Sequence, residues 1–520
     1  VGHVRPVEDF CTDYVQVMMT MYDRATISFV AGRLRYLELQ FGMHVSLNAE
    51  REAQAQQNAG GRDWFQVRKV DTHIHHSACF SQTQLMRFIR DKMKTEGSTK
   101  VLKVGDKVLS LHEVFNELGL MEEDKINADL LAMAASVGGG TADTFGRFDR
   151  FNNKYNPFGD KRLRDVFLKS DNMIDGRYLA ELTQRVMEAQ RKDCMAEWRI
   201  SIYGRSEGEW ASLATWFRTG GGAGPIFHKN VRWMIQVPRI YPVFKKIGAV
   251  NSFGDVMKNV FKPLFEVSID PSSNPDLHFF LQQMVGFDSV DDESQGTRIT
   301  LKEYPSPDHW TREENPPYTY WMYFMYANIR SLNHLRASRG LSTFTFRPHC
   351  GEAGNTSHLV SCFLLADGIN HGIKMKETPV MQYLYYLSQI GVAVSPLSND
   401  ILFLPLLESP FNTFFKRGLN VSLSTDDPLI IHLTEEPLIE EYAIAARIWK
   451  FSSTDMCELA RNSVAQSGFE EPLKRWWIGD NYRLGNDEQR SNVPHIRLAY
   501  RKVRLDEEWS LLRTLATAPA

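Results

Sequence analysis

The stretch Val67-Arg68-Lys69-Val70-Asp71-Thr72-His73 is the first of eight short β-rich runs along a chain of 520 residues. Each run is followed by a longer segment with helical periodicity. The other seven runs are Glu197 to Tyr203, Val231 to Val237, Gln283 to Asp288, Thr343 to His349, Gly368 to His371, Gly391 to Ser395 and Asn420 to Ser424. Eight β-α units in one chain predict an α/β fold, a (β/α)8 TIM barrel, and fit it better than a doubly wound sheet.

The first 62 residues have a different character. Apolar residues recur at helical spacing in Phe10 to Met21 and again in Ala31 to Arg51. Gly60-Gly61 then breaks the pattern just before the first β-rich run. Residues 1–62 are therefore expected to form a helical arm that packs on the barrel.

The barrel itself is expected to span residues 63–505, with residues 506–520 as a C-terminal tail. The longest gap lies between the first and second runs, where about 120 residues replace the single helix usual in this fold. We therefore predict a long insertion after the first strand, at about residues 76–196.

Composition narrows the class of protein. The chain has 60 Lys+Arg against 63 Asp+Glu, and its net charge of -3 argues against binding of nucleic acid or anionic membranes through overall positive charge. No apolar run reaches the length of a membrane span. The six cysteines include no CxxC pair, which predicts reduced thiols and a cytoplasmic location. The chain starts at Val1 without the layout of a signal peptide, and it is expected to be trimmed upstream.

Residues that suit a metal ion stand where the predicted strands end. In a barrel, the carboxyl ends of the strands face one common site. The first run leads into His73 and His75, which share a face because they are two residues apart on a strand. The fifth run ends in His349, and the eighth leads into Asp426. Three nitrogens and one oxygen suit one Zn²⁺ per subunit, with a further position left for water.

Each of these residues alone has an ordinary explanation. A single HxH is a weak signal, and an isolated His at a strand end is usually a hydrogen-bonded structural residue. An Asp before Asp-Pro is usually part of a turn or a helix cap. The four together favour a metal site, because four residues that can bind a metal fall at the ends of only three predicted strands.

Two further residues extend this set. His371 ends the sixth run and could be a fifth ligand, but a histidine that does not bind the metal serves better as a base for the attacking water. Glu352 lies three residues past His349 and can reach the substrate side of the site. A protonated Glu352 would act as the general acid if the reaction puts a proton on a ring nitrogen.

With these residues in place, the chain resembles the AMP deaminase family along nearly its whole length. The resemblance rests on Lys69 to His75, His349 to Gly354 and Ser422 to Leu429. The nucleotide enzyme in particular is indicated by Arg150 to Gly159, supported by Ala196 to Arg205 and Met456 to Ser463. The departures from the family pattern are His76-Ser77, Arg150 and Ile430-Ile431, which affect substrate surroundings and none of the metal ligands.

The resemblance implies that His73, His75, His349 and Asp426 bind zinc, that His371 is the proton acceptor and that Glu352 donates a proton to ring nitrogen N1. The residues it implies for substrate contact are His75, Arg150, Phe151, Asn152, Asn153, Lys154, Tyr155, Glu352, Asp427, Pro428, Leu429 and Ile430. Arg150 and Lys154 are four apart and could form a cationic pair for a phosphate, although an i,i+4 basic pair is otherwise usually a solvated one.

The function that follows is zinc-dependent hydrolytic deamination of AMP to IMP and ammonia, in a homo-oligomer (a dimer or a tetramer). Two alternatives stay open. The same chemistry could act on adenosine or another purine, or the barrel could be a catalytically silent zinc-binding regulatory subunit. The second is disfavoured because Glu352 and His371 are both retained around the metal.

Overall fold

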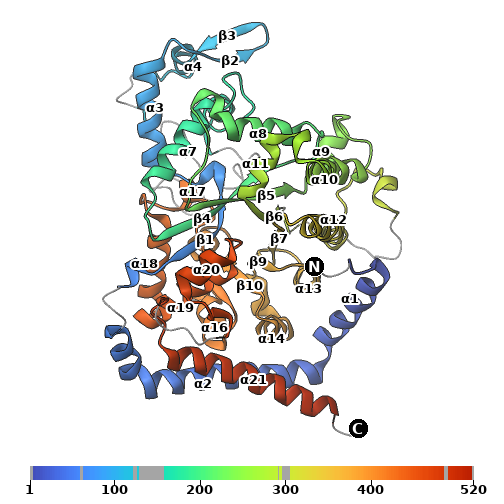
Figure 1. Cartoon of the computed structure of the whole chain (residues 1–520), viewed down its shortest axis with the longest axis vertical. Helices are drawn as coiled ribbons and strands as arrows, with labels where there is room; N and C mark the ends of the chain where they lie inside the picture. Colours follow the sequence, from blue (N-terminus) through green and yellow to red (C-terminus); the bar gives the residue numbers. More distant parts are fainter. Residues whose placement is uncertain are drawn as a thin grey trace.

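The computed structural model describes residues 4–58, 63–120, 126–127, 157–290, 292–294, 305–484 and 490–517. Parallel strands lie at the centre of the molecule (Figure 1). They form two sheets, with the orders β1-β4-β5-β6-β7 and β11-β10-β9-β8. The strands are β1 (Lys69–His75), β4 (Cys194–Ser201), β5 (Val231–Pro238), β6 (Met284–Val290), β7 (Thr345–Phe346), β8 (His349–Cys350), β9 (Gly368–His371), β10 (Gly391–Val394) and β11 (Val421–Leu423).

The two sheets join at both edges and close a barrel. On one side, β7 and β8 follow each other directly, interrupted only by Arg347 and Pro348. On the other side, Asp426 just after β11 forms a parallel bridge with Ile74 of β1. The His75 N–H donates to the Asp426 carbonyl oxygen at 2.9 Å, and the Asp426 N–H donates to that of His73 at 2.9 Å. The predicted (β/α)8 barrel is therefore confirmed.

Most strand boundaries differ from the predicted runs by a few residues, and three differences are the clearest. β1 continues to His75, and β4 begins at Cys194, three residues before the predicted start. The fifth run was expected to be one continuous strand, but it is split into β7 and β8. Pro348 has no N–H to donate to the ladder, which explains the break.

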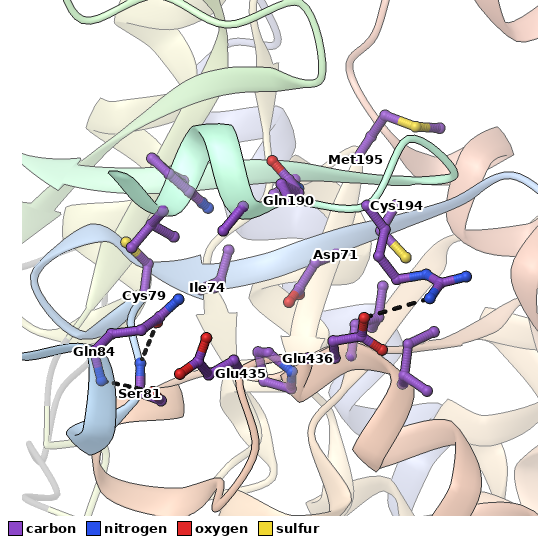
Figure 2. Close-up of a pocket in the computed structure, with 18 residues that line it drawn as sticks. Asp71, Ile74, Cys79, Ser81, Gln84, Gln190, Cys194, Met195, Glu435 and Glu436 are labelled. Carbon is purple, nitrogen blue, oxygen red and sulfur yellow. Dashed lines mark hydrogen bonds and ion pairs between the residues drawn. The ribbon is translucent and has the colours of Figure 1, made fainter. Parts of the chain in front are cut away.

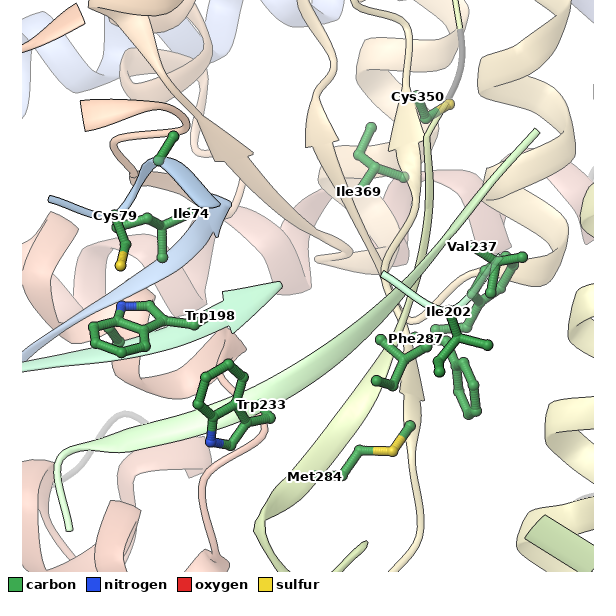
Figure 3. Close-up of a cluster of buried hydrophobic side chains, with 14 of the residues drawn as sticks. Ile74, Cys79, Trp198, Ile202, Trp233, Val237, Met284, Phe287, Cys350 and Ile369 are labelled. Atoms are coloured by element: carbon green, nitrogen blue, oxygen red, sulfur yellow. The ribbon is translucent and has the colours of Figure 1, made fainter. Parts of the chain in front are cut away.

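Helices cover the outside of the barrel, where large apolar side chains of the strands meet them (Figure 3). Trp233 of β5 packs edge-on against Trp198 of β4 and Phe217 of α8, with ring centroids 5.7 Å apart in both pairs. The covering helices are α8 (Glu209–Thr219), α9 (Tyr241–Lys246), α10 (Phe253–Ile269), α11 (Pro275–Gln283), α12 (Tyr318–Ser338), α13 (Ser357–Leu365), α14 (Pro379–Ser388), α15 (Pro396–Leu402), α16 (Phe411–Arg417), α17 (Pro428–Ile431), α18 (Pro437–Trp449), α19 (Ser453–Gln466) and α20 (Glu471–Ile478).

The segment between β1 and β4 holds far more than one helix. Its described elements are α3 (Gln82–Glu96), the antiparallel hairpin of β2 (Lys100–Val104) and β3 (Lys107–Ser110), α4 (Leu111–Glu117), α6 (Lys161–Phe167) and α7 (Arg177–Ala189). The hairpin was not anticipated from the sequence. Figure 1 shows it with α4 at the tip of the molecule, away from the barrel.

The N-terminal region is helical, as its periodicity predicted. α1 (Val7–Tyr22) is followed by the long α2 (Arg24–Gln57). Asp23 caps the N-terminus of α2, because its side chain accepts from the Thr26 N–H at 2.7 Å. Leu34, Leu37 and Phe41 of α2 are buried. The C-terminal helix α21 (His495–Thr517) runs beside α2 (Figure 1), and Arg33 pairs with its Glu508.

A buried ionic group joins α2, α19 and α21. The Arg497 guanidinium of α21 pairs with Glu52 at 2.8 Å, Asp455 at 2.6 Å and Glu458 at 2.9 Å. We call these four residues the Arg497 cluster. The predicted domain boundaries remain predictions, and the one at residue 505 falls inside α21. Among the described residues, no helix has the length and apolarity to cross a lipid bilayer.

Candidate metal centre

The four predicted ligands come together at the closing edge of the barrel. His73 and His75 lie on β1, His349 begins β8, and Asp426 follows β11. One ligand atom from each of the four lies within 4.8 Å of the others, and all four residues are buried. The bridge between β1 and the end of β11 therefore does two things at once, because it closes the barrel and sets Asp426 beside the two β1 histidines.

The spacing of these atoms suits a cation of the size of Zn²⁺. His73 Nε2 lies 3.4 Å from His75 Nε2, and Asp426 Oδ1 lies 3.3 Å and 3.2 Å from these two nitrogens. Ligands held about 2.0–2.1 Å from a tetrahedral Zn²⁺ are separated from one another by about 3.3–3.4 Å. The donor set of three imidazoles and one carboxylate also fits this ion.

Hydrogen bonds fix the direction of the ligands. His75 Nδ1 lies 2.7 Å from Gln236 Oε1 of β5, and His349 Nδ1 lies 3.0 Å from Asp288 Oδ1 of β6. An imidazole that donates from Nδ1 keeps the lone pair on Nε2 for a metal. Ser398 Oγ donates to Asp426 Oδ2 at 2.7 Å. These contacts hold the ligands in place from the neighbouring strands and α15.

His371 and Glu352 lie on the same side of the barrel as the ligands. His371 Nε2 is 3.5 Å from Glu352 Oε1 and 3.9 Å from Asp426 Oδ2. This Nε2 atom is buried without a hydrogen-bond partner among the described residues, whereas His371 Nδ1 lies 3.3 Å from Asn399 Nδ2. His371 and Asp426 both have left-handed φ angles, 68° and 61°. Non-glycine residues adopt this strained backbone rarely and often at functional sites.

The surroundings shift the pKa values of these two groups in opposite directions. Burial, with the negative charges of Asp426 and Glu293, raises the pKa of Glu352 well above its ordinary value. Burial lowers the pKa of His371 to about 3. The raised pKa favours the protonated form of the Glu352 carboxyl group, while the lowered pKa of His371 keeps its imidazole neutral at neutral pH. This pairing provides one proton donor and one proton acceptor.

No side chain among the four ligand residues carries a permanent positive charge. Burial lowers the pKa of His75, but the charges of Asp427 and Asp426 outweigh it and raise this pKa to about 9. A protonated His75 therefore balances Asp426 in the protein alone. A metal ion would replace that proton, since only a neutral imidazole can coordinate.

Asp71 strengthens the joint between β1 and β11. Its Oδ1 accepts from the Thr425 N–H at 3.2 Å, and its Oδ2 accepts from the Thr425 hydroxyl at 2.5 Å. Asp71 also lines a cavity of about 80 Å³ between β1, β4, α7 and the start of α18, together with Ile74 and Trp198 (Figure 2). None of the four metal-ligand residues lines this cavity. The metal centre and the cavity are therefore separate features.

The remaining predicted substrate-contact residues fall into two groups, one within the part of the chain that the structure describes and one outside it. Asp427, Pro428, Leu429 and Ile430 follow Asp426 directly, the last three in α17, and all four are buried. The predicted substrate-contact residues Arg150, Phe151, Asn152, Asn153, Lys154 and Tyr155 lie outside the described residues.

His76 has a structural environment. Its Nε2 lies 2.8 Å from the Thr183 hydroxyl, and its ring packs against those of Trp198 and Trp233. Burial lowers its pKa to about 3. It takes no part in the ligand set.

Sequence reasoning missed the residues that orient the ligands. Asp288 stands at the very end of the fourth predicted run, and Gln236 is the sixth of the seven residues in the third, so the strand-end argument applied to all eight runs would have indicated both. Glu293 follows β6 and accepts hydrogen bonds from the loop that carries Glu352. No pattern in the sequence marks it.

Several known proteins are similar to this chain. A sequence profile of the AMP deaminase family matches residues 2–518. The chain is 52% identical to an AMP deaminase of Schizosaccharomyces pombe and 48% identical to one of Saccharomyces cerevisiae, which it matches over 98% and 99% of its own length. It spans only 60% and 63% of these two relatives. Among solved structures, an N6-methyl-AMP deaminase from Arabidopsis thaliana is 15% identical, with a TM-score of 0.45 over 81% of this chain and 96% of that one.

Proposed function

The chain belongs to the AMP deaminase family, and from this premise we propose that it catalyses the hydrolytic deamination of AMP to IMP and ammonia with one bound Zn²⁺. The observation that carries the proposal is the meeting of His73, His75, His349 and Asp426 within 4.8 Å. Zinc so held would act as a Lewis acid that lowers the pKa of a coordinated water toward about 7.

The proposed reaction moves protons through two side chains. Water oxygen forms a bond to C6 of the purine while neutral His371 accepts a proton from that water. Glu352, in its protonated form, donates a proton to N1. The C6–N6 bond then breaks as the C6 carbonyl forms. The amino group leaves as ammonia after taking up the proton that His371 received, and the remaining proton of the C6 hydroxyl returns to the Glu352 carboxylate. The opposite pKa shifts of the two residues support these roles.

The expected contacts with the substrate come from two segments. Asp427, Pro428, Leu429 and Ile430 would line the purine, together with His75 and Glu352. The segment Arg150 to Tyr155 would bind the phosphate, with Arg150 and Lys154 as its cations. This second assignment rests on the family resemblance alone.

The experiment is ammonia release from AMP and from adenosine by zinc-loaded protein, for the wild type and the double variant Arg150→Ala/Lys154→Ala. We expect turnover of AMP to exceed that of adenosine, and we expect the double variant to lose at least about 10-fold in kcat/KM for AMP only. Equal turnover of both substrates would instead favour an adenosine deaminase. Release from neither would favour a regulatory zinc-binding barrel.

We further propose that the protein is a cytoplasmic homo-oligomer, a dimer or tetramer. The absence of a CxxC pair among the six cysteines and the family resemblance support this proposal. Light scattering during size-exclusion chromatography measures the mass directly, and a peak at the mass of a single 59.7 kDa chain would contradict it.

A further inference from the structure

Two carboxylates near the end of β6 hold the segment that begins at His349. Asp288 of β6 accepts from the His349 N–H at 3.0 Å. Glu293, five residues later, accepts from the next part of the same segment. Its Oε2 accepts from the Gly351 N–H at 2.9 Å, and its Oε1 accepts from the Glu352 N–H at 3.4 Å. One carboxylate thus contacts the ligand residue and the other contacts the loop of the proposed acid.

Glu293 is buried, and among the described residues its carboxylate pairs with one histidine. Its side chain is 1% exposed and lies 2.9 Å from His358 Nδ1 of α13. The His358 ring stacks on Tyr318, with centroids 4.0 Å apart and planes 10° from parallel. The Tyr318 hydroxyl donates to the His349 carbonyl oxygen at 2.6 Å. The contacts of Glu293 therefore extend back to the metal ligand.

The backbone of the loop that carries Glu352 also packs closely against Glu293. A Cβ atom added to Gly354 would lie 1.8 Å from the Glu293 carbonyl oxygen. Gly351 and Gly354 have φ angles of 68° and 69°, in the left-handed region that favours glycine. The loop from Gly351 to Gly354 thus packs on Glu293 through both its N–H groups and its bare Cα surface.

This arrangement holds the main chain of Glu352 in place, while its carboxyl group faces His371. Glu352 Oε1 lies 3.5 Å from His371 Nε2, while its N–H is held by Glu293 on the other side. Proton transfer depends steeply on the position of the donor, and an error of about 1 Å can cost about 10²-fold in rate. We propose that Glu293 is a positioning residue that holds Glu352 in place for proton donation to the substrate ring. This inference rests on the proposed function.

The test compares Glu293→Ala and Glu293→Gln in the full chain loaded with zinc, with AMP as substrate. Alanine removes both acceptors, so we expect kcat to fall by about 10²-fold while KM changes by less than about 3-fold. Glutamine keeps one acceptor oxygen of the same reach, so it should recover about 10-fold of that loss. Zinc content should stay equal in all three proteins.

A matched control is available in the Arg497 cluster. Glu52 is another buried carboxylate paired with a histidine, His44, at 2.9 Å. Glu52→Gln should lower the Tm without lowering kcat. If Glu293→Ala reduces kcat no more than Glu52→Gln does, or if its loss appears only in zinc content, the inference is wrong.

A second measurement does not depend on activity. Amide hydrogen exchange at Gly351 and Glu352 should be faster in Glu293→Ala than in the wild type, because both N–H groups lose their acceptor. Unchanged exchange would overturn the inference. Absence of ammonia release from AMP by the wild type would contradict the proposed function instead, and exchange alone would then decide the role of Glu293. If Glu293→Ala does not fold, Glu293→Gln against His358→Asn, which keeps a donor toward Glu293, provides the same comparison.

Discussion

The metal centre and the Arg497 cluster are both buried groups of charged side chains, but their positive charge has different origins. In the Arg497 cluster, one guanidinium that is 0% exposed meets Glu52, Asp455 and Glu458, so the chain supplies its own cation. At the metal centre, one carboxylate faces three imidazoles, and no Lys or Arg side chain pairs with Asp426 among the described residues.

Because of this difference, we expect the Arg497 cluster to stabilise the fold and the metal centre to serve the reaction. A buried ion pair completed within the chain holds helices together, and breaking one side of it leaves an uncompensated charge. A buried donor set that requires an external cation is instead suited to bind one. Variants of the metal centre should therefore lose zinc and activity, whereas variants of the Arg497 cluster should lose stability.

The largest expected effect is on the metal ligands. Asp426→Asn removes the charge and His349→Ala removes a nitrogen, so each should lose zinc and at least about 10³-fold of kcat/KM for AMP, equivalent to about 4 kcal/mol. Metal analysis with steady-state kinetics measures both losses. The control is His278→Ala, on the outer helix α11, which should retain zinc and rate. A ligand variant that keeps zinc and full activity would remove the distinction between the two groups.

The next effect concerns Glu352 and His371, which lie beside the ligands without belonging to the four-residue set. Glu352→Gln and His371→Ala should each lower kcat by about 10²- to 10⁴-fold, equivalent to about 3–5 kcal/mol, because each removes one proton transfer. Zinc content should stay near that of the wild type. Near-normal turnover of AMP by either variant would show that its role is assigned wrongly.

The Arg497 cluster should give the opposite result. Arg497→Met removes the guanidinium that the buried carboxylates of Glu52, Asp455 and Glu458 share, and it should lower the free energy of unfolding by about 3–5 kcal/mol. Its kcat for AMP per folded molecule should not change. Lys262→Met is the control, since Lys262 pairs with Glu207 in a solvent-exposed ion pair whose loss should shift the Tm little. A fall in kcat with unchanged Tm in Arg497→Met would contradict the comparison.

The smallest effect is a dependence on pH. Burial raises the pKa of Glu52 and Glu458, but Arg497 and their other partners, among them His44 and Arg501, lower both pKa values by more than this. Carboxylates with a lowered folded pKa stabilise the fold above their unfolded pKa of about 4.3, and that stability is lost as the pH falls through the folded values. Without Arg497 the folded pKa values should rise. The Tm difference between wild type and Arg497→Met should therefore shrink as the pH falls below about 4.3, through the lowered pKa values of the folded wild type, and a constant difference would contradict this account.

Much of the fold could be predicted from the sequence, because a (β/α)8 barrel repeats one pattern, a strand followed by a helical segment. Each run from Val67 to Ser424 alternates with a helical segment, and all eight runs correspond to strands of the barrel. The boundaries were less visible. Pro348 interrupts the fifth strand through its missing N–H, and the β2–β3 hairpin lies within the insertion, where no barrel repeat guides the prediction.

The site was predictable where strand ends carry residues of unusual chemistry. His73, His75, His349 and Asp426 meet because the carboxyl ends of parallel strands share one end of the barrel. Glu293 could not be found this way. It acts on backbone N–H groups of Gly351 and Glu352, and contacts of a side chain with a distant main chain leave no pattern in the sequence.

A zinc titration of metal-free protein, with ammonia release from AMP as the readout, tests the central claim most directly. One four-ligand site per chain predicts no turnover before zinc is added, a linear rise, and a break at about one equivalent. Full turnover of AMP by the metal-free protein, or continued absence of turnover after one equivalent has bound, would contradict the account.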